Sequence, residues 1–78
     1  APNPARNHTE VRFFNPADGN VQFELYSIQG QMMMKSLEHF AIGSQRFELP
    51  LHDLTNGFYL LNIKHQNGWR QTVKLVVQ

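Results

Sequence analysis

Hydrophobic and polar residues alternate with a period of two along most of this chain. The alternation is clearest over 21–28, where Val21, Phe23 and Leu25 share one parity and Glu24 has the other. Successive side chains of a β-strand point to opposite faces of a sheet, so this pattern predicts a strand with a buried apolar face and an exposed polar face. Similar runs predict further strands over 9–14, 45–51, 58–65 and 69–78.

The last third of the chain, 54–78, contains two of these runs on either side of Asn67-Gly68. An Asn-Gly pair favours a hairpin with a type I′ turn, in which both central residues have φ > 0. In the second run the apolar residues of one parity are expected to face inward, namely Trp69, Val73, Leu75 and Val77. The C-terminal run is therefore predicted to be a packed strand with Lys74 on its outward face.

The region that follows Gly30 is less regular. It begins with three consecutive methionines, which favour helix by intrinsic propensity. The run is too short for a stable helix and follows a tight turn in which Gly30 is expected to have φ > 0, so we predict a strand over 32–37. We predict a loop over 38–43 that Phe40 and Ile42 anchor to the core.

Pro50 and the segment 52–57 interrupt the strand pattern. Proline has no amide N–H to donate to a sheet, so Pro50 predicts an edge strand or the end of a strand. Segment 52–57 is too short for an α-helix, and we expect a single helical turn that ends at Gly57 and places Leu54 against the core.

Short strands at nearly regular spacing, with almost no helix, predict an all-β antiparallel sandwich of about six strands. A chain of 78 residues is one small domain, which buries only about 60% of the surface that its unfolded chain exposes. Pro2 and Pro4 favour extended backbone near the start. We therefore expect 1–8 to be a lead-in from an upstream domain and 9–78 to be the sandwich.

The composition argues against nucleic-acid and membrane partners. Seven Lys and Arg residues are balanced by six Asp and Glu residues, and these charges are scattered along the chain. Such a balance provides no basic stripe for nucleic acid or for an anionic membrane surface. The apolar runs are far shorter than the roughly 20 residues that a membrane-spanning helix needs, so no transmembrane segment is predicted.

The histidines do not have the spacing of a metal site. The chain has no cysteine, and its histidines are widely separated: His8, His39, His52 and His65. Zinc sites show close ligand spacing. We therefore expect exposed or boundary imidazoles, and no metal or cofactor.

Nothing in the sequence indicates an enzyme. Ser27, Ser36 and Ser44 lack the Gly-x-Ser-x-Gly elbow of serine hydrolases. Asp18 and Asp53 adjoin turn-forming residues, where short carboxylates usually accept hydrogen bonds from backbone amides. There is also no glycine-rich loop that could hold a phosphate.

Two apolar features leave alternatives open. Met32, Met33 and Met34 either fill the core, with one of them exposed, or form an adaptable binding surface. Phe58 and Leu60 lie opposite the inward parity of their strand, so both of its faces are apolar in the first half. Either this strand is central and covered on both sides, or it presents an apolar patch to a partner.

A series of motifs resembles a known family. In chain order they are Ala-Pro-Asn-Pro-Ala (1–5), Leu-Tyr-x-x-x-Gly-Gln (25–31), Leu-x-x-Leu-x-x-Gly-Phe-Tyr-Leu-Leu (51–61), Asn-Gly (67–68) and Lys-Leu-Val-Val (74–77). The series is similar to the C-terminal sorting domain of the type IX secretion system of Bacteroidetes. The resemblance covers essentially the whole chain. Phe58, where a smaller aliphatic residue is common, and the triple Met depart from the family pattern.

The resemblance implies an immunoglobulin-like antiparallel β-sandwich of about six to seven short strands, at the end of a larger cargo protein. It implies that the type IX translocon recognises the domain in the periplasm and exports the cargo across the outer membrane, to the cell surface or beyond. In most members a sortase then removes the domain, and the cargo is attached to the surface or released. The domain of this family is not itself an enzyme.

The residues expected to matter follow from these motifs: Pro2, Asn3 and Pro4 at the junction with the cargo, and Gly30, Gly57, Tyr59, Asn67, Gly68, Lys74, Leu75, Val76 and Val77 in the sandwich. The expected partners are the translocon, sortase and attachment-complex proteins, and the upstream cargo domain. Exposed strand edges would also allow a weak homodimer. The alternative function is a retained structural or protein-docking sandwich of a cell-surface or secretion-machinery protein.

Overall fold

The computed structural model describes residues 8–51 and 54–78, and within these ranges the chain is all-β. Six strands are present in this part of the chain, and it contains no helix: β1 (His8–Asn15), β2 (Gly19–Ser27), β3 (Met32–Phe40), β4 (Gly43–Pro50), β5 (Gly57–His65) and β6 (Arg70–Val77). The predicted fold class is therefore confirmed. Of the expected lead-in 1–8, residues 1–7 lie outside the described residues, and His8 begins β1. His52 and Asp53 of the predicted helical turn also lie outside the described residues.

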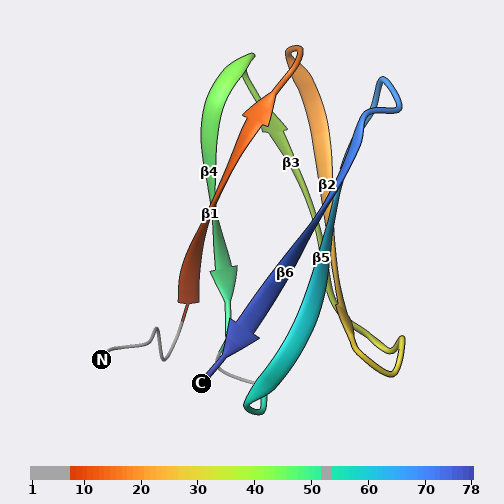
Figure 1. Cartoon of the computed structure of the whole chain (residues 1–78). Coiled ribbons are helices and arrows are strands. Elements are labelled where there is room, and N and C mark those ends of the chain that lie inside the picture. The colour runs from red at the N-terminus through yellow and green to blue at the C-terminus, as the bar shows by residue number, and fades with distance from the viewer. Residues whose placement is uncertain (1–7, 52–53) are drawn as a thin grey trace.

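The strands form two antiparallel sheets that face each other (Figure 1). One sheet has two strands, β1 and β4, and the other has four strands in the order β3-β2-β5-β6. Strand β4 pairs only with β1 and ends at Pro50, as expected for an edge strand. The two central strands of the larger sheet, β2 and β5, therefore lie between neighbours on both sides.

Aromatic side chains join the two sheets. Phe47 of β4 stacks on Phe23 of β2, with ring centroids 3.8 Å apart and an interplanar angle of 6°. Phe13 and Phe40 meet the ring of Phe23 edge-on, at 5.6 and 5.8 Å. Aromatic pairs of this kind contribute about 0.5–1.5 kcal/mol beyond the area that they bury. The inward positions predicted from the alternation make up most of the core, which consists of Val11, Phe13, Val21, Phe23, Leu25, Phe47, Leu49, Leu51, Tyr59, Leu61, Ile63 and Val77.

The segment 38–43 differs from the prediction of a loop. Strand β3 continues to Phe40, because the central strand β2 offers it a partner along its whole length, from Leu25 opposite Met34 to Gly19 opposite Phe40. Phe40 packs against the core as expected. Ile42 does not, because it lies in the short connection to β4 with 60% of its surface exposed.

The methionines form strand β3 as predicted, but two of them are exposed rather than one. The register between β2 and β3 shifts at Leu25/Tyr26, and this irregularity breaks the simple alternation at the start of β3. Met34 packs against the core, whereas Met32 and Met33 remain exposed.

The β5–β6 hairpin turn is not the predicted type I′ turn. Among the described residues φ is positive only at glycines, so Asn67 does not adopt the required conformation, whereas Gly68 has a φ of 98°. The His65 amide donates to the Trp69 carbonyl at 2.8 Å, and the Gly68 amide donates to the His65 carbonyl at 2.9 Å. These bonds define a three-residue loop that closes with a left-handed glycine. The Asn67 side chain, which accepts from the Trp69 amide at 2.9 Å, supports this alternative.

Candidate functional site

One end of the β5–β6 hairpin brings together most of the residues predicted from the motifs. Gly57 lies opposite Val77, and Tyr59 lies opposite Leu75. On the same ladder Lys74 lies opposite Leu60. The β2–β3 turn that contains Gly30 is at this end too, because Ser27 at the end of β2 pairs with Tyr59 (Figure 1).

Tyr59 fastens the entry into β5. Its ring is buried in the core, and its hydroxyl donates to the Thr55 carbonyl at 2.7 Å. A tyrosine near the start of a strand that bonds to backbone a few residues upstream is the arrangement known as the tyrosine corner of immunoglobulin-like sandwiches. Leu54 packs against the core beside this connection, as predicted, and its amide donates to the Leu51 carbonyl at 2.9 Å.

Two glycines shape the same end by their backbone conformation. Gly57 has a φ of 148° where the chain enters β5, and Gly30 has a φ of 90° in the β2–β3 turn. A Cβ built at either position meets nothing within 4 Å, so space is not the reason for glycine. The positive φ is the reason, because residues with a Cβ rarely adopt it. Gly30 therefore has the conformation expected from the sequence.

The outward side of this hairpin end is apolar and uncovered. Phe58, Leu60 and Val76 are 49%, 42% and 54% exposed. The Lys74 ammonium lies over the Phe58 ring, 4.6 Å from its centroid, in a cation–π contact. These four residues, Phe58, Leu60, Lys74 and Val76, are called the outer patch below. Strand β5 is thus central, but no described element covers its outer face, which supports the second of the two alternatives left open by the sequence.

A compact polar cluster borders the outer patch. Glu24 accepts hydrogen bonds from Lys64 at 2.8 Å and from the Tyr26 hydroxyl at 3.1 Å, and a third from Gln22. The Lys64 bond, opposed by burial, lowers the pKa of Glu24, and burial raises the pKa of Tyr26. The sequence predicted an exposed Glu24, but only 7% of its side chain is exposed, because Lys64 of β5 and two neighbours on its own strand, Gln22 and Tyr26, bond to it. These bonds hold the side chains of the cluster in place, and the charge of Lys64 balances that of Glu24.

The remaining predicted residues lie elsewhere. Asn67 and Gly68 form the turn at the opposite end of the hairpin, far along the ladder from the pair Gly57–Val77. They are structural there, because the turn sets the register of β6. Pro2, Asn3 and Pro4 lie outside the described residues.

His65 corrects the expectation that the histidines are exposed or at a boundary. Its ring is buried, its Nε2 lies 2.7 Å from the Ala17 carbonyl, and its Nδ1 accepts from the Asn67 amide at 3.0 Å. The ring thus ties the β5–β6 turn to the β1–β2 turn. The alternation along β5 could have predicted this burial, because residue 65 shares the inward parity of Tyr59, Leu61 and Ile63. Among the described residues, no group of three metal-ligating side chains comes together.

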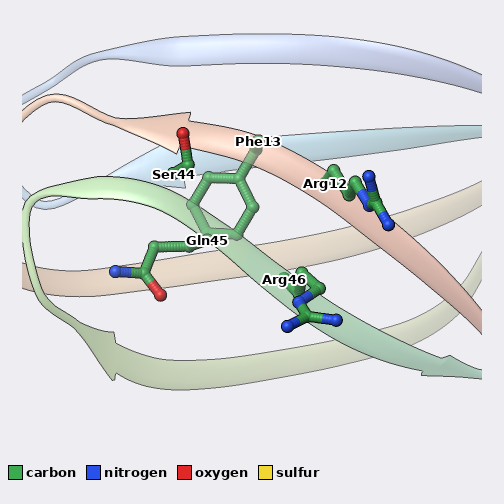
Figure 2. A pocket seen from close by; sticks show the side chains of 5 residues that line it. All are labelled: Arg12, Phe13, Ser44, Gln45 and Arg46. Carbon is green, nitrogen blue, oxygen red and sulfur yellow. The ribbon is translucent and has the colours of Figure 1, made fainter.

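A further hollow lies on the other sheet. It is a shallow groove of about 620 Å³ lined by Arg12, Phe13, Ser44, Gln45 and Arg46, and Figure 2 shows the two arginines reaching from neighbouring strands. Arg12 and Arg46 are direct cross-strand partners, and Glu10 binds both at 2.9 and 3.1 Å. The guanidinium of Arg12, followed by that of Arg46, lowers the pKa of Glu10. The like charges are therefore compensated within the face itself.

Asp18 accepts a hydrogen bond from a backbone amide, as expected from the sequence. Its carboxylate accepts from the Ile42 amide at 2.6 Å. The buried Asn15 amide assists by donating to the Phe40 and Ala41 carbonyls at 3.1 and 2.8 Å. These bonds hold the β3–β4 connection against the end of β1. No helix within the described part of the chain is long and apolar enough to cross a membrane.

Comparison with known protein families gives a match over the whole chain. A family model described as "Secretion system C-terminal sorting domain" matches residues 1–78, the whole chain. A search of curated proteins and a search of solved structures each gave no match.

Proposed function

Because the chain belongs to the family of type IX secretion system C-terminal sorting domains, we propose that it is a folded export signal that the translocon recognises by the outward side of its β5–β6 hairpin. The family membership implies interaction with the secretion machinery and export to the cell surface or the extracellular space. The further steps proposed are recognition in the periplasm and transfer of the attached cargo across the outer membrane.

The outer patch is the observation that supports this site of recognition. Three large apolar side chains and one cation lie together, exposed, on the hairpin that contains the motif residues Gly57, Tyr59 and Lys74. Exposed apolar groups that cluster in this way mark surfaces for partner proteins. Tyr59 and Gly57 act through the fold, because they hold the hairpin end in shape, whereas Lys74 and Val76 are available for contact.

The chain itself provides a signal and not a catalyst in this proposal. The family is a sorting-signal family and not a known family of enzymes. Removal of the domain after export is therefore assigned to a separate sortase, which would cut near Pro2, Asn3 and Pro4, upstream of the sandwich.

A retained docking module is the second candidate, and exposed apolar residues at a second place favour it. Met32, Met33 and Leu37 are exposed on β3, at the opposite edge of the same sheet from β6. A domain that stays on the surface protein can use such a second surface to bind a neighbour, and Met side chains adapt well to partners.

The test is export of a reporter fused to residues 1–78 and directed to the periplasm by its own N-terminal signal. The host is a type IX-competent bacterium, and the control is the same strain without a functional translocon. We expect the reporter at the surface or in the medium of the competent strain only. Accumulation in the periplasm of both strains would contradict the proposal. The mass of the exported reporter separates the two candidates, because it lacks the domain after sortase cleavage and contains it if the domain is retained.

A further inference from the structure

We propose that the open edge of β6 is a strand-addition site, and that its occupant is an extended segment of a secretion-machinery protein with acidic side chains facing Arg70 and Lys74. The identity of the partner rests on the proposed function. The hydrogen-bond ladder, the open edge and the charges of β6 support the site itself.

The ladder determines which backbone groups the edge presents. The His65 amide donates to the Trp69 carbonyl, so these two residues form a hydrogen-bonded pair, and the register continues without a break from Lys64 opposite Arg70 to Gly57 opposite Val77. Antiparallel pairs alternate between hydrogen-bonded and non-hydrogen-bonded positions. The N–H and C=O groups directed away from β5 are therefore those of Arg70, Thr72, Lys74 and Val76.

The β6 edge has none of the features that oppose strand addition at β3 and β4. In the described part of the chain no strand pairs with its outer edge, and β6 contains neither proline nor a shift of register. Strand β4 ends at Pro50, and β3 has a register irregularity. Strand β3 also has Glu38 on the parity of Met34, the face that points toward the other sheet, and inward-pointing charges protect edges. Strand β1 also contains neither proline nor a shift of register, so it shares this freedom from obstacles. Glu10 and Arg12 of β1 already pair with each other, whereas the outward cations of β6 lack such a partner among the described residues.

The outward face of β6 defines the chemistry of the occupant. Its outward side chains are Arg70, Thr72, Lys74 and Val76, two cations and one apolar group without an acid among them. Among the described residues, no carboxylate lies within ion-pair distance of Arg70 or Lys74, whereas Lys64 on the neighbouring strand is paired with Glu24. Opposite charges facing each other across strands stabilise a sheet, and like charges destabilise it. A strand that alternates acidic outward residues with apolar inward residues complements this edge.

A second copy of this chain fits the edge poorly. Two β6 strands joined edge to edge would place Arg70 and Lys74 of both copies on one face, and β6 contains no acid to compensate them. The charges therefore favour a different protein over the homodimer that exposed edges would otherwise allow.

The experiment measures backbone amide exchange in the purified chain, first alone and then with a synthetic peptide of alternating glutamate and valine. In the free chain the amides of Arg70, Thr72, Lys74 and Val76 should exchange quickly, and those of the intervening residues slowly. The acidic peptide should protect the first set, and a matched peptide of alternating lysine and valine should not. Protection of these four amides in the free chain would overturn the proposal, because a second copy or the chain itself would then fill the edge. Failure of the acidic peptide to protect them, or equal protection by both peptides, would overturn it too.

Two pairs of variants locate the site. Thr72→Pro removes one outward N–H from the edge, and Thr72→Val keeps that N–H while it removes the Thr72 side-chain bond to Asn62. We expect Thr72→Pro to weaken binding of the acidic peptide by about tenfold or more, and Thr72→Val to leave it unchanged. Lys74→Glu should weaken binding by about tenfold, and Lys35→Glu on the outward face of β3 should not. Equal effects within both pairs would contradict the site on β6. This test uses no secretion machinery, so its failure and a failure of export remain distinguishable.

Discussion

The outward faces of the two sheets differ in how their charges are arranged. On the β1–β4 sheet, Glu10 lies between Arg12 and Arg46, and His8 lies 3.0 Å from Glu48. On the β5–β6 hairpin of the larger sheet, Arg70 and Lys74 have no carboxylate partner among the described residues, and the outer patch exposes apolar side chains beside them.

This difference concerns recognition more than folding. Exposed ion pairs such as those of Glu10 typically contribute about 0–1 kcal/mol, so compensating the β1–β4 face adds little stability. Leaving the β5–β6 face uncompensated costs little for the same reason. It does keep a cationic and apolar surface available to a partner, which a self-compensated face cannot offer.

The largest expected effect is a loss of stability caused by a substitution in the core, on which both faces depend. Phe23 contacts the rings of Phe13, Phe40 and Phe47, which come from three other strands. Phe23→Ala should lower the free energy of unfolding by about 3–5 kcal/mol, which is most of the stability expected of a domain this small. Chemical denaturation monitored by circular dichroism measures it. A loss below about 1 kcal/mol would show that the sheets are held together in some other way.

A smaller effect should be confined to the hairpin end that supports the outer patch. Gly57→Val places a β-branched side chain at a φ of 148°, so we expect a loss of about 1–3 kcal/mol. Asn56→Ala, at the exposed neighbouring residue, is the matched control and should change stability by less than about 0.5 kcal/mol. If thermal melts show the same small change for both variants, the backbone conformation of Gly57 is not what requires glycine.

Acidic pH should reduce the stabilising contribution of a carboxylate on each of the two faces. The pKa of Glu24 is lowered from its ordinary value of 4.5, chiefly by the Lys64 hydrogen bond, and that of Glu10 is lowered by Arg12 and Arg46. A carboxylate with a lowered pKa stabilises the fold above its unfolded pKa, and this contribution is lost as the pH falls through its folded pKa. The melting temperature should therefore decrease as the pH is lowered from about 5 to about 3.

The two carboxylates should contribute unequally to this acid dependence. Only 7% of the Glu24 side chain is exposed, against 33% for Glu10, so solvent screens Glu24 less. Glu24→Gln should flatten the pH profile of the melting temperature more than Glu10→Gln does. The opposite order would mean that the cluster around Glu24 is not the stronger of the two networks.

The sequence predicted the strands and the core because each depends on local alternation. It did not predict the burial of Glu24 or His65, because these depend on cross-strand neighbours such as Lys64 and on a turn 48 residues away along the chain. The extra residues of β3 have the same origin, since β2 provides their partner. The prediction of a type I′ turn at Asn67 was wrong, because the Asn67 side chain accepts a hydrogen bond from the Trp69 amide and so supports a longer loop.

The candidate site was partly predictable. The motif residues Gly57, Tyr59 and Lys74 were named from the sequence, and the register brings them to one end of the hairpin. Phe58 and Leu60 were noticed as apolar on both faces of a strand, but alternation alone could not show whether a further layer covers them. Only the order of the strands and the exposure of these side chains identify the outer patch.

The smallest effect on stability is expected at Lys74, where the predicted effect on export is large. Lys74→Glu removes an exposed cation–π contact of about 0.5–1 kcal/mol, so the fold should persist. Arg46→Glu on the other sheet is the matched control, because it reverses an exposed charge of the same sign.

Recognition through the outward face of the β5–β6 hairpin is tested most directly by the fraction of a fused reporter that reaches the surface or medium. This fraction is measured for wild type, Lys74→Glu and Arg46→Glu, together with the melting temperature of each domain. We expect Lys74→Glu to leave most of the reporter in the periplasm and Arg46→Glu to export it like wild type, with both domains folded. Equal export by the two folded variants, whether normal or lost, would contradict recognition through the outward face of the β5–β6 hairpin.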